Sequence, residues 1–140
     1  DIIEDYYPVT LQIFAEDADG NNLFDPSYDK NIIDEVTVTY NGEVMKLKRP
    51  DAAKSKINLD FYMPSWYGAT LRSYKDSSAK YYMFIGEWDA TKKWDEELQI
   101  NWPDGTYNTI RFKLVTPGID HCLYLLDGKS QRESTFKFVK

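Results

Sequence analysis

Four side chains with oxygen ligands lie close together in an acidic segment, and they form one candidate metal site: Asp17, Asp19, Asn21 and Asp25. Carboxylate and amide oxygens suit Ca²⁺, which accepts clusters of hard ligands. The spacing departs from an EF-hand loop, because Asn22 stands where that loop needs Gly and Tyr28 stands where it needs Glu. Asp, Asn and Gly also form turns, so we expect a solvated turn rather than a calcium site, and no other cofactor.

A second candidate group consists of aromatic residues outside the regular apolar positions: Trp66, Tyr67, Trp88 and Trp94. Rings in loops or at strand ends can stack on the apolar faces of sugars or anchor a protein interface. Neighbouring acids and amides could then bind sugar hydroxyls. The alternative is that these rings plug the ends of a β-sandwich, and we expect this core role more than the ligand-binding one.

The residues for nucleophilic catalysis are scarce. His121 and Cys122 are the only histidine and the only cysteine. Adjacent residues of a strand point to opposite faces, so the two cannot act as a dyad, and we expect Cys122 to be a buried structural thiol. The sequence contains neither a G-x-S-x-G element nor a phosphate-binding glycine loop. We therefore expect no catalytic residues and no enzyme activity.

The composition fits one folded domain. The chain has 140 residues, a hydrophobic fraction of 42% and a net charge of −6. A negative charge argues against nucleic acid as a partner, since phosphate backbones are bound by basic surfaces. No apolar run approaches the roughly 18 residues that span a bilayer. We expect a single domain over residues 1–140.

Alternation of apolar and polar residues is the main structural signal, and it predicts half-buried strands. Val9, Leu11, Ile13 and Ala15 share one face of the first such run. Asn41-Gly42 follows a second run, and this dipeptide favours a type I′ turn and a β-hairpin.

Further alternating runs continue along the chain: 57–63, 81–85, 97–102, 110–114, 123–125 and 136–138. About eight or nine short strands with turns between them predict an all-β, Ig-like antiparallel β-sandwich with Greek-key links. Residues 90–98 are expected to form a loop or one helical turn. Two long loops are expected, over 16–34 and 64–79. Several strands carry aromatics on both faces, which indicates central strands or a contact patch.

Four fragments together are similar to small secreted lipoprotein domains of gut Bacteroidetes: 9–26 (VTLQIFAEDADGNNLFDP), 32–46 (IIDEVTVTYNGEVMK), 84–110 and the terminal LLDGK with TFKFVK. The I-N-W-x-D-G-T element also resembles a turn of PKD-type Ig-like repeats. This resemblance implies an Ig-like β-sandwich on the cell envelope or outer membrane, or in the secreted fraction. It also implies that residues 1–8 form an N-terminal linker to a lipid anchor. It implies no catalytic residues.

These observations predict a non-catalytic cell-envelope module that mediates protein or surface interactions. The alternative is a glycan-binding module of a polysaccharide-capture system, which would use the loop aromatics. Contact with a membrane is expected only through the N-terminal lipid anchor.

Overall fold

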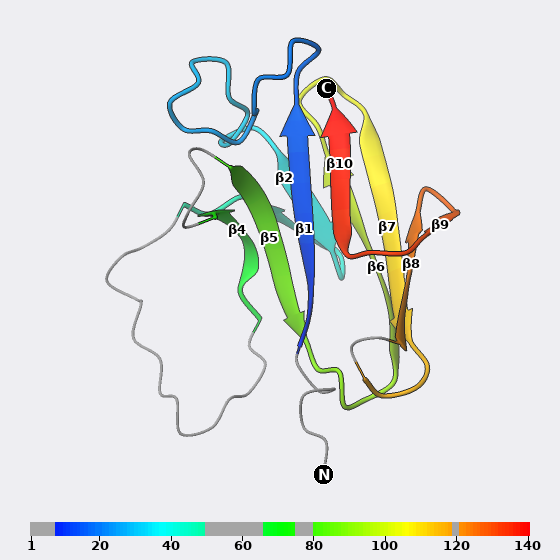
Figure 1. Cartoon of the computed structure of the whole chain (residues 1–140). Coiled ribbons are helices and arrows are strands. Elements are labelled where there is room, and N and C mark those ends of the chain that lie inside the picture. The colour runs from blue at the N-terminus through cyan, green and yellow to red at the C-terminus, as the bar shows by residue number, and fades with distance from the viewer. Residues whose placement is uncertain (1–7, 50–65, 75–79, 119–120) are drawn as a thin grey trace.

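The computed structural model describes residues 8–49, 66–74, 80–118 and 121–140, and two β-sheets pack face to face in it (Figure 1). The four-stranded sheet has the order β10-β1-β5-β4, with β1 (Val9–Glu16), β4 (Gly68–Ser73), β5 (Tyr81–Trp88) and β10 (Thr135–Val139). The six-stranded sheet has the order β3-β2-β6-β7-β8-β9, with β2 (Thr37–Tyr40), β3 (Glu43–Lys46), β6 (Trp94–Asn101), β7 (Tyr107–Leu114), β8 (Cys122–Leu126) and β9 (Lys129–Gln131). The all-β sandwich expected from the sequence is confirmed. Within the described ranges, no helix is long and apolar enough to cross a membrane.

One strand pair differs from the antiparallel expectation. β10 pairs with β1 in parallel, with Phe14 opposite Lys137. Both strands point the same way in Figure 1, where they are red and blue. A hairpin can join only antiparallel strands. β10 reaches β1 from the six-stranded sheet after β9, so its direction is not set by a hairpin with β1.

The expected loops needed two corrections. The segment 64–79 is not all loop, because β4 (Gly68–Ser73) lies within it and places Ala69 and Leu71 in the core. In the segment 90–98, strand β6 already begins at Trp94. β4 has only two apolar residues in alternation, Ala69 and Leu71, and β6 opens with Trp94 followed by three acids, so neither start shows a clear alternation. The strand expected over 57–63 lies outside the described residues.

The core lies between the sheets and follows the alternation. In β1, Val9, Leu11 and Ile13 are completely buried. From the opposite sheet, Ile100 of β6 and Phe112 of β7 meet them as buried side chains. Burial of such side chains stabilises by about 1.5–3 kcal/mol each before entropy is counted. The inward faces therefore hold the two sheets together.

The segment between β1 and β2 closes one end of this core, and it lies at the top of Figure 1. Its polar residues face outward, but Phe24 and Ile33 are fully buried. A backbone bond attaches it to β1, since Leu23 N donates to Ala15 O at 2.9 Å, and a second bond closes the segment on itself, since Ile32 N donates to Leu23 O at 2.9 Å. The long acidic loop expected from the sequence is thus a packed cap.

One edge between the sheets is bridged by backbone hydrogen bonds. Lys48 follows β3 and pairs with Thr70 of β4 as a parallel bridge. Its N–H donates to Ala69 O at 2.9 Å, and its carbonyl accepts from Leu71 N at 2.8 Å. The bridge joins the edge of the six-stranded sheet to β4, and β4 is the strand that follows Trp66 and Tyr67.

The turn between β2 and β3 is the type expected from Asn41-Gly42. Both residues have positive φ, 52° and 79°. Strands β2 and β3 pair in register on either side, with Tyr40 opposite Glu43. A left-handed conformation at the second residue is the reason that Gly is favoured there.

Replacing Gly42 by Val should therefore destabilise the domain by about 1–2 kcal/mol, because a β-branched residue resists positive φ. Urea unfolding followed by tryptophan fluorescence measures the change. Val44→Thr is the control, since it exchanges one β-branched side chain for another at an exposed position of β3. An unfolding midpoint of Gly42→Val equal to that of wild type would contradict the turn assignment.

Candidate functional site

The four aromatic residues singled out from the sequence divide between core and surface. Trp88 is only 8% exposed, at the end of β5, and Trp94 is half-buried at the start of β6. Trp66 is 46% exposed and Tyr67 is 37% exposed, just before β4. The core interpretation thus holds for Trp88, whereas Trp66 and Tyr67 keep the accessibility that a binding role requires.

Trp88 and Trp94 both pack on Phe112 of β7, which lies in the sheet opposite Trp88 and next to Trp94 in the same sheet. The ring centroids of Trp88 and Phe112 are 4.5 Å apart with planes at 68°, and those of Trp94 and Phe112 are 5.7 Å apart at 75°. Edge-to-face pairs of this kind add to the energy of burial. The Trp94 Nε1–H donates to the backbone oxygen of Asp89 at 2.7 Å, so this ring is fixed by the loop before β6.

Trp66 packs against this cluster and remains partly exposed to solvent. Its ring centroid lies 5.2 Å from that of Trp88 and 5.0 Å from that of Tyr40. Tyr40 ends β2, where its place in the alternation predicts a strand residue and gives no sign of a binding role. Its ring contacts with Trp66 and Trp88 make it part of the aromatic cluster.

A short hydrogen-bond chain fixes Tyr40. Its hydroxyl donates to Glu96 Oε1 at 2.6 Å and accepts from Trp88 Nε1 at 3.1 Å. Burial of the hydroxyl raises the pKa of Tyr40 above its usual value, and the hydrogen bond to Glu96 adds to that effect. Tyr40 therefore stays neutral and donates at physiological pH.

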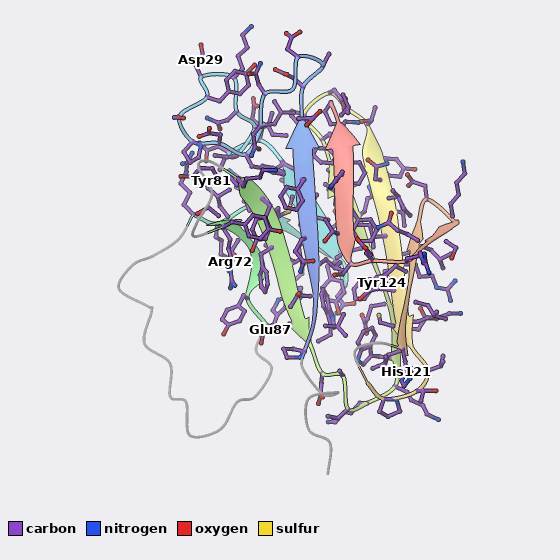
Figure 2. The ribbon with its side chains drawn as sticks, in the orientation of Figure 1. Asp29, Arg72, Tyr81, Glu87, His121 and Tyr124 are labelled. Carbon is purple, nitrogen blue, oxygen red and sulfur yellow. The ribbon has the colours of Figure 1, made fainter. Side chains whose placement is uncertain are left out.

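These rings form part of an open hollow, which we call the Trp66 hollow. Its volume is about 300 Å³, and it is lined by Tyr40, Asn41, Glu43, Met45, Trp66, Glu87 and Trp88. Glu87 lies near the end of β5 that is away from Tyr81 (Figure 2). An exposed indole beside two carboxylates and an amide can stack on an apolar surface and accept hydrogen bonds from hydroxyl or N–H donors.

A second group of rings covers the outer surface of the four-stranded sheet. Phe14, Tyr74 and Tyr82 lie with ring centroids 5.2–6.1 Å apart and planes within 32° of one another. We call these three residues the outer ring group. In the sequence, the only sign of it is that β5 carries aromatics on both faces. Tyr67 is linked to the group through Arg72, which lies opposite Tyr82 and whose guanidinium carbon is 5.7 Å from the Tyr67 ring centroid.

In the structure, the carboxylates considered as Ca²⁺ ligands accept hydrogen bonds that form turns. The Asp17 carboxylate accepts from the backbone N–H groups of Asp19 and Asn21 at 3.0 and 2.9 Å and from the Tyr28 hydroxyl at 2.5 Å. Asp25 Oδ1 accepts from Ser27 instead. Within the described ranges, no three His, Cys, Asp or Glu side chains gather as metal ligands. The acids act as turn-forming residues.

The hydrogen bonds to Asp17 change its acidity. The Tyr28 hydroxyl, followed by the Asn21 N–H, lowers the Asp17 pKa from 3.8 to about 2. The same bond raises the pKa of Tyr28. Each of these effects favours the charged carboxylate and the neutral phenol, which together hold the cap in shape.

His121 and Cys122 lie as expected for adjacent residues at the start of a strand. Cys122 is buried, and desolvation raises the pKa of its thiol. His121, which is labelled in Figure 2, is exposed, and its Nδ1 lies 2.9 Å from the Pro117 carbonyl oxygen. The prediction that the Cys122 thiol is buried is confirmed.

Comparison of the chain with protein-family models, with curated proteins and with solved structures finds no match. Its function is therefore inferred from the residues and their arrangement alone.

Tyr40→Phe should destabilise the domain by about 1–2 kcal/mol, because it removes the bond to Glu96 and leaves the Trp88 N–H without its acceptor. Chemical unfolding measures this change. Tyr107→Phe is a matched control, since Tyr107 is 61% exposed. Equal stability of the two variants would show that the Tyr40 hydroxyl does not stabilise the cluster.

The Asp17 carboxylate should make stability depend on pH in the acid range. Its pKa is lowered on folding, so its contribution is complete above 3.8 and is lost as pH falls toward about 2. Asp17→Asn should be less stable than wild type at pH 6, and the difference should shrink between pH 4 and pH 2. Melting temperatures across this range test the expectation. Asp29→Asn, an exposed acid of the same cap, should follow the wild-type profile; a constant Asp17→Asn difference would refute the assignment.

Proposed function

We propose that this domain is a non-catalytic recognition module of the cell-envelope type, and that it binds its partner through the Trp66 hollow. The observation that carries the proposal is the state of the Trp66 ring. It is nearly half exposed, yet it contacts Tyr40 and Trp88 with centroid distances of 5.0 and 5.2 Å. A large ring that is held in place without being buried is suited to contact another molecule.

The support beneath Trp66 matters for binding energy. Trp88 is anchored to the opposite sheet by Phe112, and Tyr40 is held by Glu96. Binding therefore has little side-chain freedom to remove, and preorganisation of this kind increases affinity. Tryptophan and tyrosine also dominate the binding energy of many protein interfaces. A protein or surface partner is thus the first candidate.

A glycan is the second candidate, favoured by the polar lining of the same hollow. Asn41, Glu43 and Glu87 adjoin the rings, and their oxygens can accept hydrogen bonds from sugar hydroxyls while Trp66 stacks on the sugar ring. The resemblance to envelope lipoprotein domains is compatible with either partner. The choice between them rests on direct binding measurements.

Tryptophan fluorescence should distinguish the two partners. Wild-type protein is titrated with a panel of plant and host glycans, alongside Trp66→Ala and the exposed-ring control Tyr107→Ala. A saturable shift that is lost only in Trp66→Ala would identify a glycan module, because only this substitution removes the stacking surface.

A flat glycan response directs the test to protein partners. A photo-cross-linking amino acid is then placed at position 66 and, as a control, at position 107, and the variants are exposed to intact cell envelopes. A defined adduct from position 66 alone supports a protein partner. If neither the titration nor the cross-linking depends on Trp66, the proposed binding surface is wrong.

A further inference from the structure

The outer face of the four-stranded sheet carries two rings with a cation on each side. Register places Lys137 of β10 beside Phe14 of β1, and Tyr82 of β5 beside Arg72 of β4. The Phe14 and Tyr82 ring centroids are 5.2 Å apart, which closes the row. The row runs across four strands, about 14 Å at roughly 4.8 Å per strand spacing. We call it the Lys137–Arg72 row.

Arg72 is fixed at its end of the row by an aromatic ring rather than by an acid. Its guanidinium carbon lies 3.6 Å from the centroid of the Phe84 ring. Phe84 faces outward with Tyr82 and is still only 7% exposed. By contrast, Arg111 pairs with Asp95 at 2.6 Å. In the part of the chain that the structure describes, Arg72 has no such carboxylate, so its hydrogen-bond donors are available to a ligand.

The charged side chains described on this face are mostly cationic, whereas the chain as a whole is negative. A hollow of about 590 Å³ adjoins the row, and Phe14, Tyr74, Lys80 and Lys137 are among its lining residues. Among the lining residues that the structure describes, Glu16 is the one acid. The chain as a whole has a net charge of −6, whereas the Trp66 hollow is lined by Glu43 and Glu87. The outer face is therefore the place where an anionic ligand meets favourable charge.

We propose that this face binds an acidic polysaccharide of the uronic acid class. The rings of the outer ring group stack on the apolar faces of the sugars, and Arg72 and Lys137 pair with the carboxylates. Arg is suited to this role because its planar guanidinium binds a carboxylate with two parallel hydrogen bonds. Polar side chains next to the row, Gln12 and Thr135 among them, suit sugar hydroxyls. The proposal does not depend on the Trp66 hollow.

A linear chain fits the face better than a single sugar. The row extends over four strands, and its two cations lie at opposite ends. One monosaccharide could reach one end only. In Figure 1 this sheet faces the viewer, and β10, β1 and β5 lie side by side along it.

The test measures binding of polygalacturonate by isothermal titration calorimetry, with highly methyl-esterified polygalacturonate as the uncharged counterpart. We expect saturable binding of the acidic polymer and at least tenfold weaker binding of the ester. The double variant Arg72→Gln/Lys137→Gln should lower affinity roughly tenfold or more, because two charge-assisted contacts are lost. Tyr74→Ala should also weaken binding, since it removes an exposed stacking ring.

Lys93→Gln/Lys129→Gln is the matched control, because it removes the same charge from exposed positions away from this face. Its affinity should stay within about twofold of wild type. Trp66→Ala should bind the acidic polymer normally, which separates this proposal from the proposed function. Circular dichroism confirms that each variant is folded.

Three results would overturn the proposal. The first is absence of binding to both polygalacturonate and alginate. The second is an equal loss in the two double variants, which would indicate attraction by overall charge. The third is equally tight binding of single-stranded DNA with the same dependence on Arg72 and Lys137, which would assign the face to nucleic acid.

Discussion

The contact between Trp88 and Phe112 joins the two sheets, and the other rings of the aromatic cluster pack on this pair. Trp88 comes from β5 and Phe112 from β7, and their ring centroids lie 4.5 Å apart across the core. Trp94 packs on Phe112, and Trp66 and Tyr40 pack on Trp88. A buried contact of this size fixes the spacing of the sheets locally. The exposed Trp66 ring is therefore supported by the core rather than by a loop.

Strand β5 divides its side chains between two faces because successive residues point to opposite sides of a sheet. Met83 and Ile85 point inward and are completely buried. Tyr82 and Phe84 point outward, where they meet Phe14 and Arg72. The same strand then ends in Trp88, after a register shift against β1. Shifts of this kind redirect side chains at the end of a strand. One element thus contributes to the core, to the outer face and to the Trp66 hollow.

The acidic segment shows why charge and turn residues alone describe a loop poorly. The Asp17 carboxylate accepts hydrogen bonds from three residues, Asp19, Asn21 and Tyr28, and these bonds shape the turn. The apolar residues between the acids, Phe24 and Ile33, then fill the end of the sandwich. On the outside, polar side chains accept hydrogen bonds from backbone N–H groups. On the inside, apolar side chains cover the end of the core. The hydrogen bonds and buried side chains of this acidic segment make it a structural cap.

Local signals in the sequence determined much of the fold. The alternation in Val9–Glu16 and the Asn41-Gly42 turn depend on neighbours in the chain, so both could be predicted. The tertiary structure decided the candidate sites, because Tyr40 meets Glu96 and Trp88 only when β2, β6 and β5 come together. It also decided that β10 lies parallel to β1, which places Lys137 beside Phe14. Alternation tells which residues share a face of one strand. Which strands lie next to each other depends on the packing of the whole chain.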